Sequence, residues 1–282
     1  MFGAYLFVAS LVASAVGGML GMAGGIFVVP ILTASGVGIH TAIAASIVSV
    51  IACSCGSAAA FLRRRLTNIR LAIVLELATT LGALTGVLLS GIVPTAALFL
   101  LFAVVLVVSA QQMLARRSEP PAETEAELGG WGNTLRLHAS YPDPDAGQEI
   151  AYAVRRVPLA MTLMYGAGLV SALLGIGSGV LKIPAMDSAL RLPLKVSSAT
   201  SNFMIGVTAA ASAGAYFARG DVVPSIAGPV ALGSVVGAIL GARILIAVSS
   251  QKLRLMFVGI LLLLATQMGL AAFGVALSGA PS

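Results

Sequence analysis

Two glycine-rich stretches hold the residues whose types and spacing could do chemistry, and that chemistry is anion binding. Gly24 and Gly25 lie in the first stretch, and Gly177, Ser178 and Gly179 lie in the second. Glycines at this density interrupt a helix, because glycine loses more backbone entropy on folding than any other residue. A helix that restarts after the interruption presents free N–H donors and roughly half a positive charge. The sequence therefore predicts that these helix starts bind an anion.

Polar side chains follow each stretch and would add donors for the same anion. The second half of the chain offers Thr200, Ser201 and Asn202, and the first half offers Ser46 at the position that matches Ser201. Hydroxyl and amide groups can donate hydrogen bonds to the oxygens of an anion. Because Ala45 stands where the second half has Thr200, we expect the second half to supply most of the polar contacts to the anion.

Lys182 is the basic residue that the expected helices leave inside the membrane. It precedes Arg191 by nine residues, which places it about 13 Å deep if the segment is a regular helix. A charge at that depth costs at least a few kcal/mol unless it is paired. Two interpretations stay open: Lys182 pairs with a bound anion, or it pairs with a structural partner or lies less deep. The first copy has Val28 at the matching position.

Glu76 and His40 are the candidates for binding a coupling ion, either a proton or sodium. Glu76 follows Arg70 by six residues, or about 9 Å of helix, so pairing with an arginine is the alternative interpretation. His40 stands at an expected helix start, where it could titrate near neutral pH or act as an interfacial anchor or cap. The sequence contains no metal-spaced histidine cluster, so we expect neither a metal site nor a cofactor.

The composition places all these residues in a membrane protein. Hydrophobic residues make up 59% of the 282 residues and charged residues only 9%, and the mean hydropathy is +1.03. Several apolar runs reach the roughly 20 residues that a helix needs to span a bilayer. The net charge of +6 lies mainly between these runs, as topology signals do, and not in a nucleic-acid-binding patch. We therefore expect the lipid bilayer, and no nucleic acid, as a partner.

The first glycine-rich stretch recurs in the second half of the chain. Three of its residues have counterparts 154 positions later: Gly21, Gly25 and Pro30 match Gly175, Gly179 and Pro184. Broken helices leave backbone groups unpaired, which is tolerated at membrane depth only where protein buries them or they line a polar cavity. We expect the two breaks to meet near the midplane of the membrane.

The apolar runs follow the same order in both halves, which predicts two membrane repeats at residues 1–114 and 158–282. Each repeat begins with a glycine-broken helical hairpin, at 4–35 or 158–190, and continues with three apolar runs. The runs are 41–62, 69–91 and 94–114 in the first repeat, and 195–217, 222–246 and 253–277 in the second. The polar stretch 115–157 between them is predicted to be a cytoplasmic loop with a small hairpin of strands around 135–141 and 149–154.

Glycine spacing predicts close helix packing in both repeats. Gly82 and Gly86 in the first repeat match Gly237 and Gly241 in the second, and Gly233 precedes the second pair by one helical turn. Residues four apart lie on one face of a helix, and small residues there let two helices approach closely.

The distribution of basic residues favours inverted repeats. If each broken hairpin returns to the side from which it enters, fourteen basic residues share one side and only Arg219 lies on the other. The fourteen are Arg63, Arg64, Arg65, Arg70, Arg116, Arg117, Arg136, Arg155, Arg156, Arg191, Lys195, Arg243, Lys252 and Arg254. Single crossings would divide the loop charges ten to five. Because basic residues concentrate on the cytoplasmic side, we predict an all-α polytopic membrane protein of two inverted repeats, with both termini outside.

These motifs resemble the TauE/SafE family of sulfite exporters and organosulfonate permeases. The signature of that family is similar to the segments Gly21 to Pro30 and Gly175 to Pro184. The Gly-Thr-Ser helix start of the family resembles Ala199-Thr200-Ser201 and, more distantly, Ala44-Ala45-Ser46. The resemblance covers nearly the whole chain apart from 115–157. It implies a secondary transporter of small sulfur oxyanions or sulfonates.

The function we predict is transport of small sulfur-containing anions, such as sulfite and sulfoacetate, across the bacterial inner membrane by alternating access. Another small anion, thiosulfate or a carboxylate, is the nearest alternative. A membrane enzyme is disfavoured because the apolar runs contain no paired carboxylates and no Ser/His/Asp set. A cation transporter is disfavoured because Glu76 is the only acid that could serve it. A homo-oligomer is compatible with the sequence.

Overall fold

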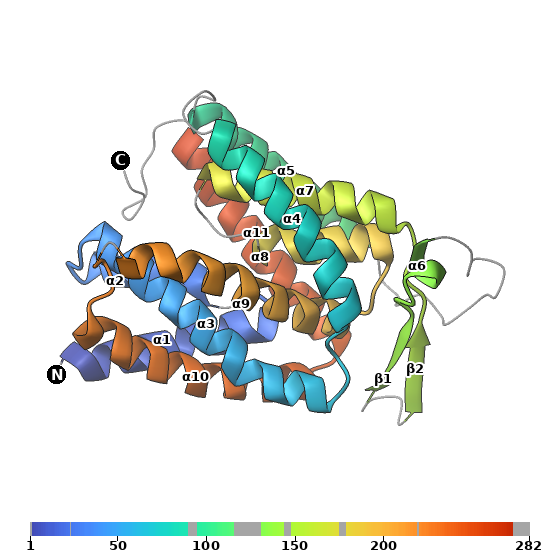
Figure 1. Cartoon of the computed structure of the whole chain (residues 1–282), viewed down its shortest axis with the longest axis horizontal. Coiled ribbons are helices and arrows are strands. Elements are labelled where there is room, and N and C mark those ends of the chain that lie inside the picture. Colours follow the sequence, from blue (N-terminus) through green and yellow to red (C-terminus); the bar gives the residue numbers. More distant parts are fainter. Residues whose placement is uncertain are drawn as a thin grey trace. The chain divides into compact units, whose positions relative to one another are not determined.

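The computed structural model describes residues 2–22, 24–89, 95–115, 131–143, 148–174, 179–218 and 220–272, most of them in helices (Figure 1). The elements of the first half are α1 (Phe2–Leu20), α2 (Gly25–Ala34), α3 (Ile39–Arg63), α4 (Ile69–Leu89) and α5 (Thr95–Ala115). Between the halves lie α6 (Trp131–Thr134), β1 (Ala139–Asp143) and β2 (Gln148–Tyr152). The second half contains α7 (Val157–Leu174), α8 (Gly179–Ala185), the π-helix η2 (Met186–Leu190), α9 (Leu194–Ala218), α10 (Pro224–Ala247) and α11 (Ser250–Ala272).

The predicted order of elements is confirmed for the described residues. Each apolar run corresponds to one helix, and the first glycine-broken excursion consists of the two helices α1 and α2. The second predicted break involves residues 175–178, which lie outside the described residues. The predicted strand hairpin is also present, with Ala139 opposite Tyr152 in an antiparallel pair. The inverted orientation and the meeting of the two breaks stay predictions.

The chain forms two compact units, and each draws on both halves of the sequence. Within the described part, the first unit contains residues 2–64 and 201–247, and the second contains 65–200 and 248–272. Helix α9 begins in the second unit and continues in the first. The structural units therefore differ from the sequence repeats 1–114 and 158–282, which remain a prediction about internal symmetry.

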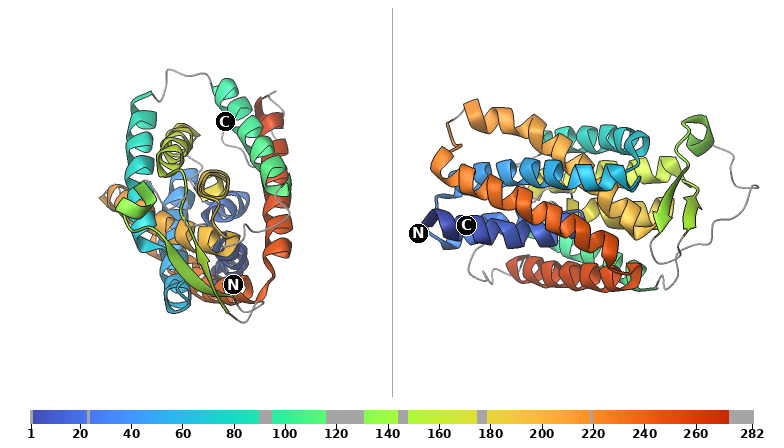
Figure 2. Two further views of the ribbon diagram at one scale, coloured as in Figure 1. Left: turned by 90° about the vertical axis from the view of Figure 1, so that its right-hand side faces the viewer. Right: turned by 90° about the horizontal axis from the view of Figure 1, so that it is seen from below.

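In the first unit, α1 packs along α10, and α10 also packs on α3 (Figure 2). The α1 contact runs along the glycine stripe of α10. A Cβ at Gly233, Gly237 or Gly241 would meet the carbonyl oxygen of Phe7, Leu11 or Ala15, respectively. Only glycine permits this approach of the two backbones, so the predicted packing face is confirmed.

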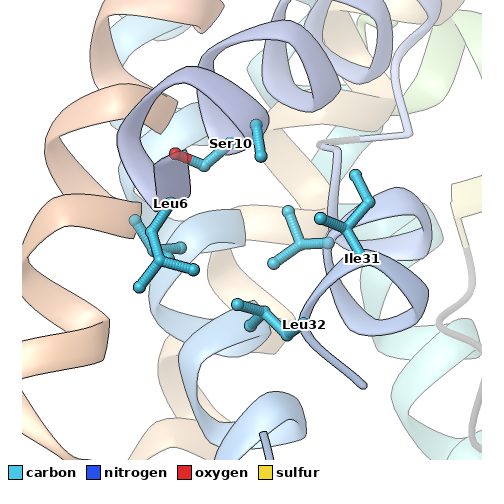
Figure 3. Close-up of a pocket in the computed structure, with 7 residues that line it drawn as sticks. Leu6, Ser10, Ile31 and Leu32 are labelled. Atoms are coloured by element: carbon cyan, nitrogen blue, oxygen red, sulfur yellow. The ribbon is translucent and has the colours of Figure 1, made fainter. Parts of the chain in front are cut away.

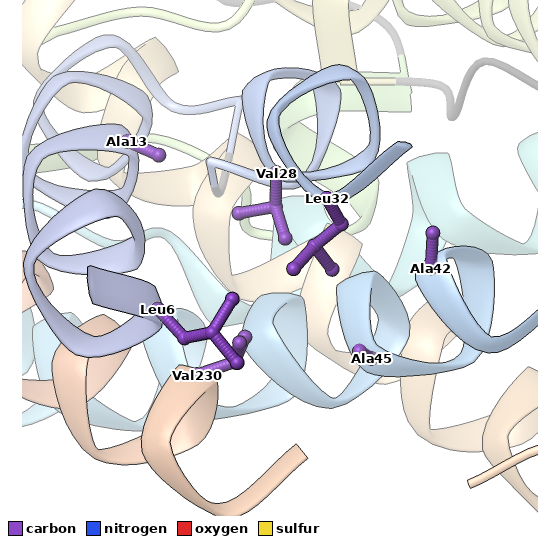
Figure 4. Packing of buried hydrophobic residues seen from close by; sticks show 7 residues of the cluster. All are labelled: Leu6, Ala13, Val28, Leu32, Ala42, Ala45 and Val230. Carbon is purple, nitrogen blue, oxygen red and sulfur yellow. The ribbon is translucent and has the colours of Figure 1, made fainter. Parts of the chain in front are cut away.

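An apolar cluster joins α1, α2, α3 and α10 within the first unit (Figure 4). Val28 and Leu32 from α2 pack in the same cluster as Leu6 and Ala45, and each of the four side chains is at most 2% exposed. Val28 and Ala45 are the counterparts of Lys182 and Thr200 in the repeat. The first copy therefore buries hydrocarbon at two positions where the second copy has polar groups.

The second unit repeats the glycine packing with other helices. A Cβ at Gly82 of α4 would meet the carbonyl oxygen of Tyr165 on α7. In the repeat, Gly82 corresponds to Gly237 and Tyr165 corresponds to Leu11, so the same pair of positions is in contact in both units. Helices α5 and α11 also pack together in the second unit (Figure 2).

The strand hairpin is held to the start of α4 by Asn68. The Nδ2 atom of Asn68 donates to the carbonyl oxygen of Leu137 at 2.8 Å and to the hydroxyl of Tyr152 at 3.3 Å. Its Oδ1 atom accepts from the N–H of Leu71 at 3.1 Å and so caps the helix. Burial raises the pKa of Tyr152, and the hydrogen bond from Asn68 opposes that rise. The phenol is therefore protonated at neutral pH.

Four helices of the described part are long and apolar enough to cross a membrane. They cover Phe2–Leu20, His40–Arg63, Ile69–Gly86 and Pro224–Ala247. On the third of them, Leu77, Leu81 and Leu84 expose 59% or more of their surface. Large apolar side chains exposed along one helix face suit contact with lipid tails and would be costly in water.

Candidate functional site

The site is built around the break between α1 and α2 in the first unit. Gly21 and Gly24 have φ angles of 73° and 68°, in the left-handed region that favours glycine. The N–H of Met22 donates to the carbonyl oxygen of Gly17 at 2.8 Å and closes the end of α1. Gly25 then begins α2, which has no side-chain cap at its N-terminus. The N–H groups of Phe27 and Val28 donate to the carbonyl oxygen of Gly24 at 3.0 and 3.3 Å, so the N–H groups that the helix itself cannot satisfy are those that precede Phe27.

Ser14 on α1 lies directly against this helix start. A Cβ added at Gly24 would be 2.8 Å from both the Cα and the Oγ of Ser14. The Ser14 side chain is completely buried, and its hydroxyl has no hydrogen-bond partner among the described residues. A buried hydroxyl without a partner costs about 1–3 kcal/mol. The start of α2 therefore has an unused donor beside it.

Helix α3 also packs against this helix start. Ser46 is 6% exposed, and its hydroxyl donates to the carbonyl oxygen of Gly25 at 3.1 Å. A Cβ at Gly25 would lie 3.0 Å from the Ser46 hydroxyl oxygen and 2.5 Å from a methyl group of Val50. The hydroxyl groups of Ser14 and Ser46 therefore both lie against the first residues of α2.

Helix α9 supplies the side chains that hold the end of α1. The hydroxyl of Ser201 donates to the carbonyl oxygen of Gly21 at 2.8 Å. Asn202 Nδ2 donates to the carbonyl oxygen of Gly18 at 2.9 Å and to the Ser57 hydroxyl at 3.2 Å. Both side chains are at most 1% exposed. They satisfy carbonyl groups that the end of a helix leaves without partners.

The structure brings together five of the residues predicted from the sequence. Gly24, Gly25, Ser46, Ser201 and Asn202 all belong to the cluster at the α1–α2 break in the first unit. Gly177 and Ser178 lie outside the described residues.

Thr200, Gly179 and His40 have other surroundings. The hydroxyl of Thr200 accepts from the backbone N–H of Asn68 at 3.2 Å, in the second unit. Gly179 begins α8 and is buried. His40 is exposed near the start of α3. The predicted roles of these three residues stay predictions.

Three serines of the cluster were not predicted from the sequence. Ser14 is the first, and the others are Ser54, whose hydroxyl donates to the carbonyl oxygen of Asn202 at 3.0 Å, and Ser57. Their spacing contained a signal, because Ser54 and Ser57 follow Ser46 by 8 and 11 residues and share its helix face. Ser14 likewise precedes Gly18 by one helical turn.

Lys182 and Glu76 form an ion pair in the second unit. Lys182 Nζ donates to Glu76 Oε2 at 2.8 Å, and the two side chains are 0% and 13% exposed. The partner seen for Glu76 is therefore Lys182, whereas Arg70 donates to the carbonyl oxygen of Arg136 at 3.4 Å. Of the two interpretations of Lys182, this geometry supports a partner within the protein.

A small cavity in the first unit is unsuited to an anion (Figure 3). Leu6, Ile31 and Leu32 line it with hydrocarbon, and its volume of ≈ 10 Å³ is at the lower limit for one water molecule. The one hydroxyl in its lining, on Ser10, donates to the carbonyl oxygen of Phe7 at 3.0 Å. Among the described residues no three His, Cys, Asp or Glu side chains gather in a way that could hold a metal ion.

Comparison with known proteins identifies the family. The family model of the sulfite exporter TauE/SafE matches residues 6–268. A protein of Bacillus subtilis (strain 168), the probable membrane transporter protein YunE, is 24% identical over 247 residues, which cover 85% of this chain and 87% of the relative. No solved structure matches the chain. The chain is thus an integral membrane protein that belongs to the TauE/SafE family of sulfite exporters.

Proposed function

We propose that this protein is a secondary transporter that moves small sulfur-containing anions by alternating access. Sulfite is the first candidate, and organosulfonates such as sulfoacetate are the next. The observation that carries the proposal is the uncapped start of α2 at Gly24 and Gly25, with the buried, unpartnered hydroxyl of Ser14 beside it. A helix N-terminus and a free hydroxyl are both donors, and the oxygens of sulfite and sulfonates are acceptors.

The chemistry of the cluster supports a small anion over a cation or a large substrate. Among the described residues, the polar side chains that bond to this break are hydroxyl and amide groups and not carboxylates. The partial positive charge of the α2 N-terminus would meet the negative charge of the ligand. Gly24 and Gly25 are packed closely against Ser14, Ser46 and Val50. This packing leaves no space for a large substrate beside these two glycines.

The comparisons support transport as the class of function. The name of the family refers to sulfite export, and the name of the Bacillus relative refers to a membrane transporter. Thiosulfate and small carboxylates would bind the same donors, so they belong among the substrates to be tested.

Uptake into proteoliposomes tests the proposal. The purified chain is expected to transport sulfite faster than protein-free liposomes do, and a panel of sulfoacetate, taurine, thiosulfate, acetate and sodium ranks the alternatives. Ser14→Ala removes the free hydroxyl and should lower the sulfite flux by about tenfold, the effect of one lost hydrogen bond to a charged group. Ser109→Ala is the matched control, because the Ser109 hydroxyl donates to the carbonyl oxygen of Val105 within its own helix, α5. Transport of sodium without any of the anions would contradict the proposal.

We also propose that the chain lies in the bacterial inner membrane with residues 115–157 in the cytoplasm and both termini outside. This orientation is supported by the distribution of basic residues, because it places fourteen of them on the cytoplasmic side and one on the other side. A fluorescent protein that folds only in the cytoplasm should stay dark at the C-terminus and fluoresce when inserted after Pro121. Fluorescence at the C-terminus would contradict the orientation.

A further inference from the structure

The ion pair between Lys182 and Glu76 is a second feature that transport of an anion can use. The ammonium group of Lys182 is completely buried, and Glu76 Oε2 lies 2.8 Å from it. Glu76 retains 13% exposure, so a proton can reach the carboxylate more easily than the lysine. The pair joins α4 to α8, which begins at Gly179.

A buried ion pair is stable only while both charges are present. Removing one partner costs about 3–5 kcal/mol, because the other charge is left in a medium of low dielectric constant. Protonation of Glu76 removes its negative charge. The Lys182 ammonium is then an unpaired charge in a medium of low dielectric constant. An anion that binds to Lys182 would neutralise its charge. Binding of a proton to Glu76 therefore favours binding of an anion to Lys182, and the reverse also holds.

We propose that Glu76 is the proton-binding site of a proton–anion symporter, and that Lys182 receives the charge of the anion when Glu76 is protonated. The inference rests on the proposed transport of small anions and adds the coupling ion to it. In the unloaded state the carboxylate of Glu76 neutralises Lys182. In the loaded state the transported anion does so, and one proton accompanies each anion.

The other ionisable groups on the neighbouring elements do not replace Glu76 in this role. Helix α7 packs against α4 and carries Tyr165 as its ionisable side chain, and η2 packs against α8 and carries Asp187. Helix α5, which also packs against α8, has no ionisable residue in its sequence. Arg70 on α4 is basic and donates to the carbonyl oxygen of Arg136, so it cannot neutralise Lys182. Glu76 is the carboxylate whose distance to Lys182 is that of a direct hydrogen bond.

The wild-type chain itself provides the first test. The probe is methanesulfonate, whose charge stays the same at neutral and mildly acidic pH, so that any pH dependence belongs to the protein. Binding is followed by thermal unfolding in detergent with increasing probe. If one proton is taken up with each anion, the Kd should fall by up to about tenfold for each unit that the pH is lowered. A Kd that does not change with pH would overturn the inference without any variant.

Variants then assign the effect to the pair. Glu76→Gln is neutral at every pH, so it should bind the probe with the low-pH Kd throughout and lose the pH dependence. Lys182→Met should weaken binding by about tenfold or more at each pH. Glu149→Gln and Lys252→Met are the matched controls, because Glu149 forms an exposed pair with Arg65 and Lys252 is exposed on α11. Both controls should behave like the wild type.

Transport assays distinguish a failure of this inference from a failure of the proposed function. In proteoliposomes, Glu76→Gln should exchange internal for external methanesulfonate, yet fail to accumulate it when the outside is made acidic. Accumulation by Glu76→Gln equal to that of the wild type would overturn the coupling role and leave anion transport intact. Absence of exchange of every anion by the wild type would instead contradict the proposed function.

Discussion

Gly24→Ala is expected to lower the rate of anion transport by about 100-fold, the loss typical of misplacing a site by about 1 Å. The new Cβ would lie 2.8 Å from both the Cα and the Oγ of Ser14, and 3.1 Å from the carbonyl oxygen of Ala13. Backbone atoms of α1 cannot rotate away as a side chain can, so the start of α2 must shift. The φ angle of 68° adds a strain of about 1–2 kcal/mol. The measurement is sulfite uptake into proteoliposomes.

Gly220→Ala separates the effect of backbone strain from the effect of the shifted site. Gly220 also has a positive φ angle, 76°, but a Cβ there would have no neighbour within 4 Å. This control should keep near-normal transport, with only the modest loss of stability that an alanine in the left-handed region causes. Equal transport by the two variants would show that the geometry at Gly24 is not needed.

Asn202→Asp is expected to lower the free energy of unfolding by about 3 kcal/mol or more. The substitution keeps the shape but replaces a donor with an acceptor that faces the carbonyl oxygen of Gly18, 2.9 Å from the present nitrogen. It also places a negative charge at a position that is 1% exposed. Thermal unfolding in detergent measures the loss.

Two comparisons test the cause of that loss. Lowering the pH should restore part of the stability, because the protonated carboxyl group can again donate to Gly18. Asn133→Asp makes the same chemical change at an exposed residue of α6 and should leave unfolding nearly unchanged. An Asn202→Asp protein as stable as the wild type at neutral pH would show that the hydrogen bond to Gly18 does not support the break.

Local information in the sequence was sufficient to predict where the helices lie. The apolar run predicted at 41–62 is α3, Ile39–Arg63, and the run at 222–246 is α10, Pro224–Ala247. A helix satisfies its backbone hydrogen bonds within one segment, and its length is set by the apolar residues of that segment. The glycine break after Leu20 also depends on local sequence, because Gly21 and Gly24 adopt the positive φ angles that favour glycine.

Neighbouring residues of the predicted site have different hydrogen-bond partners, because a helix turns by about 100° at each residue. Thr200 accepts a hydrogen bond from Asn68 in the second unit, whereas Ser201 donates to Gly21 in the first. Adjacent positions in a sequence motif therefore do not share a partner. Ser201 and Asn202 come from the second half of the chain but hold the break of the first half.

The sequence by itself determined the membrane class, the helices, the first glycine break and the family motifs, since each depends on residues close together in the chain. The tertiary structure alone decided the partners. Glu76 and Lys182 are 106 positions apart, and the π-helix Met186–Leu190 between Lys182 and Arg191 makes depth counted along a regular helix unreliable. Likewise, the glycine spacing predicted a packing face on α10 but not that Leu11 would meet Gly237. Contacts between distant segments follow from how whole helices pack, which no local pattern contains.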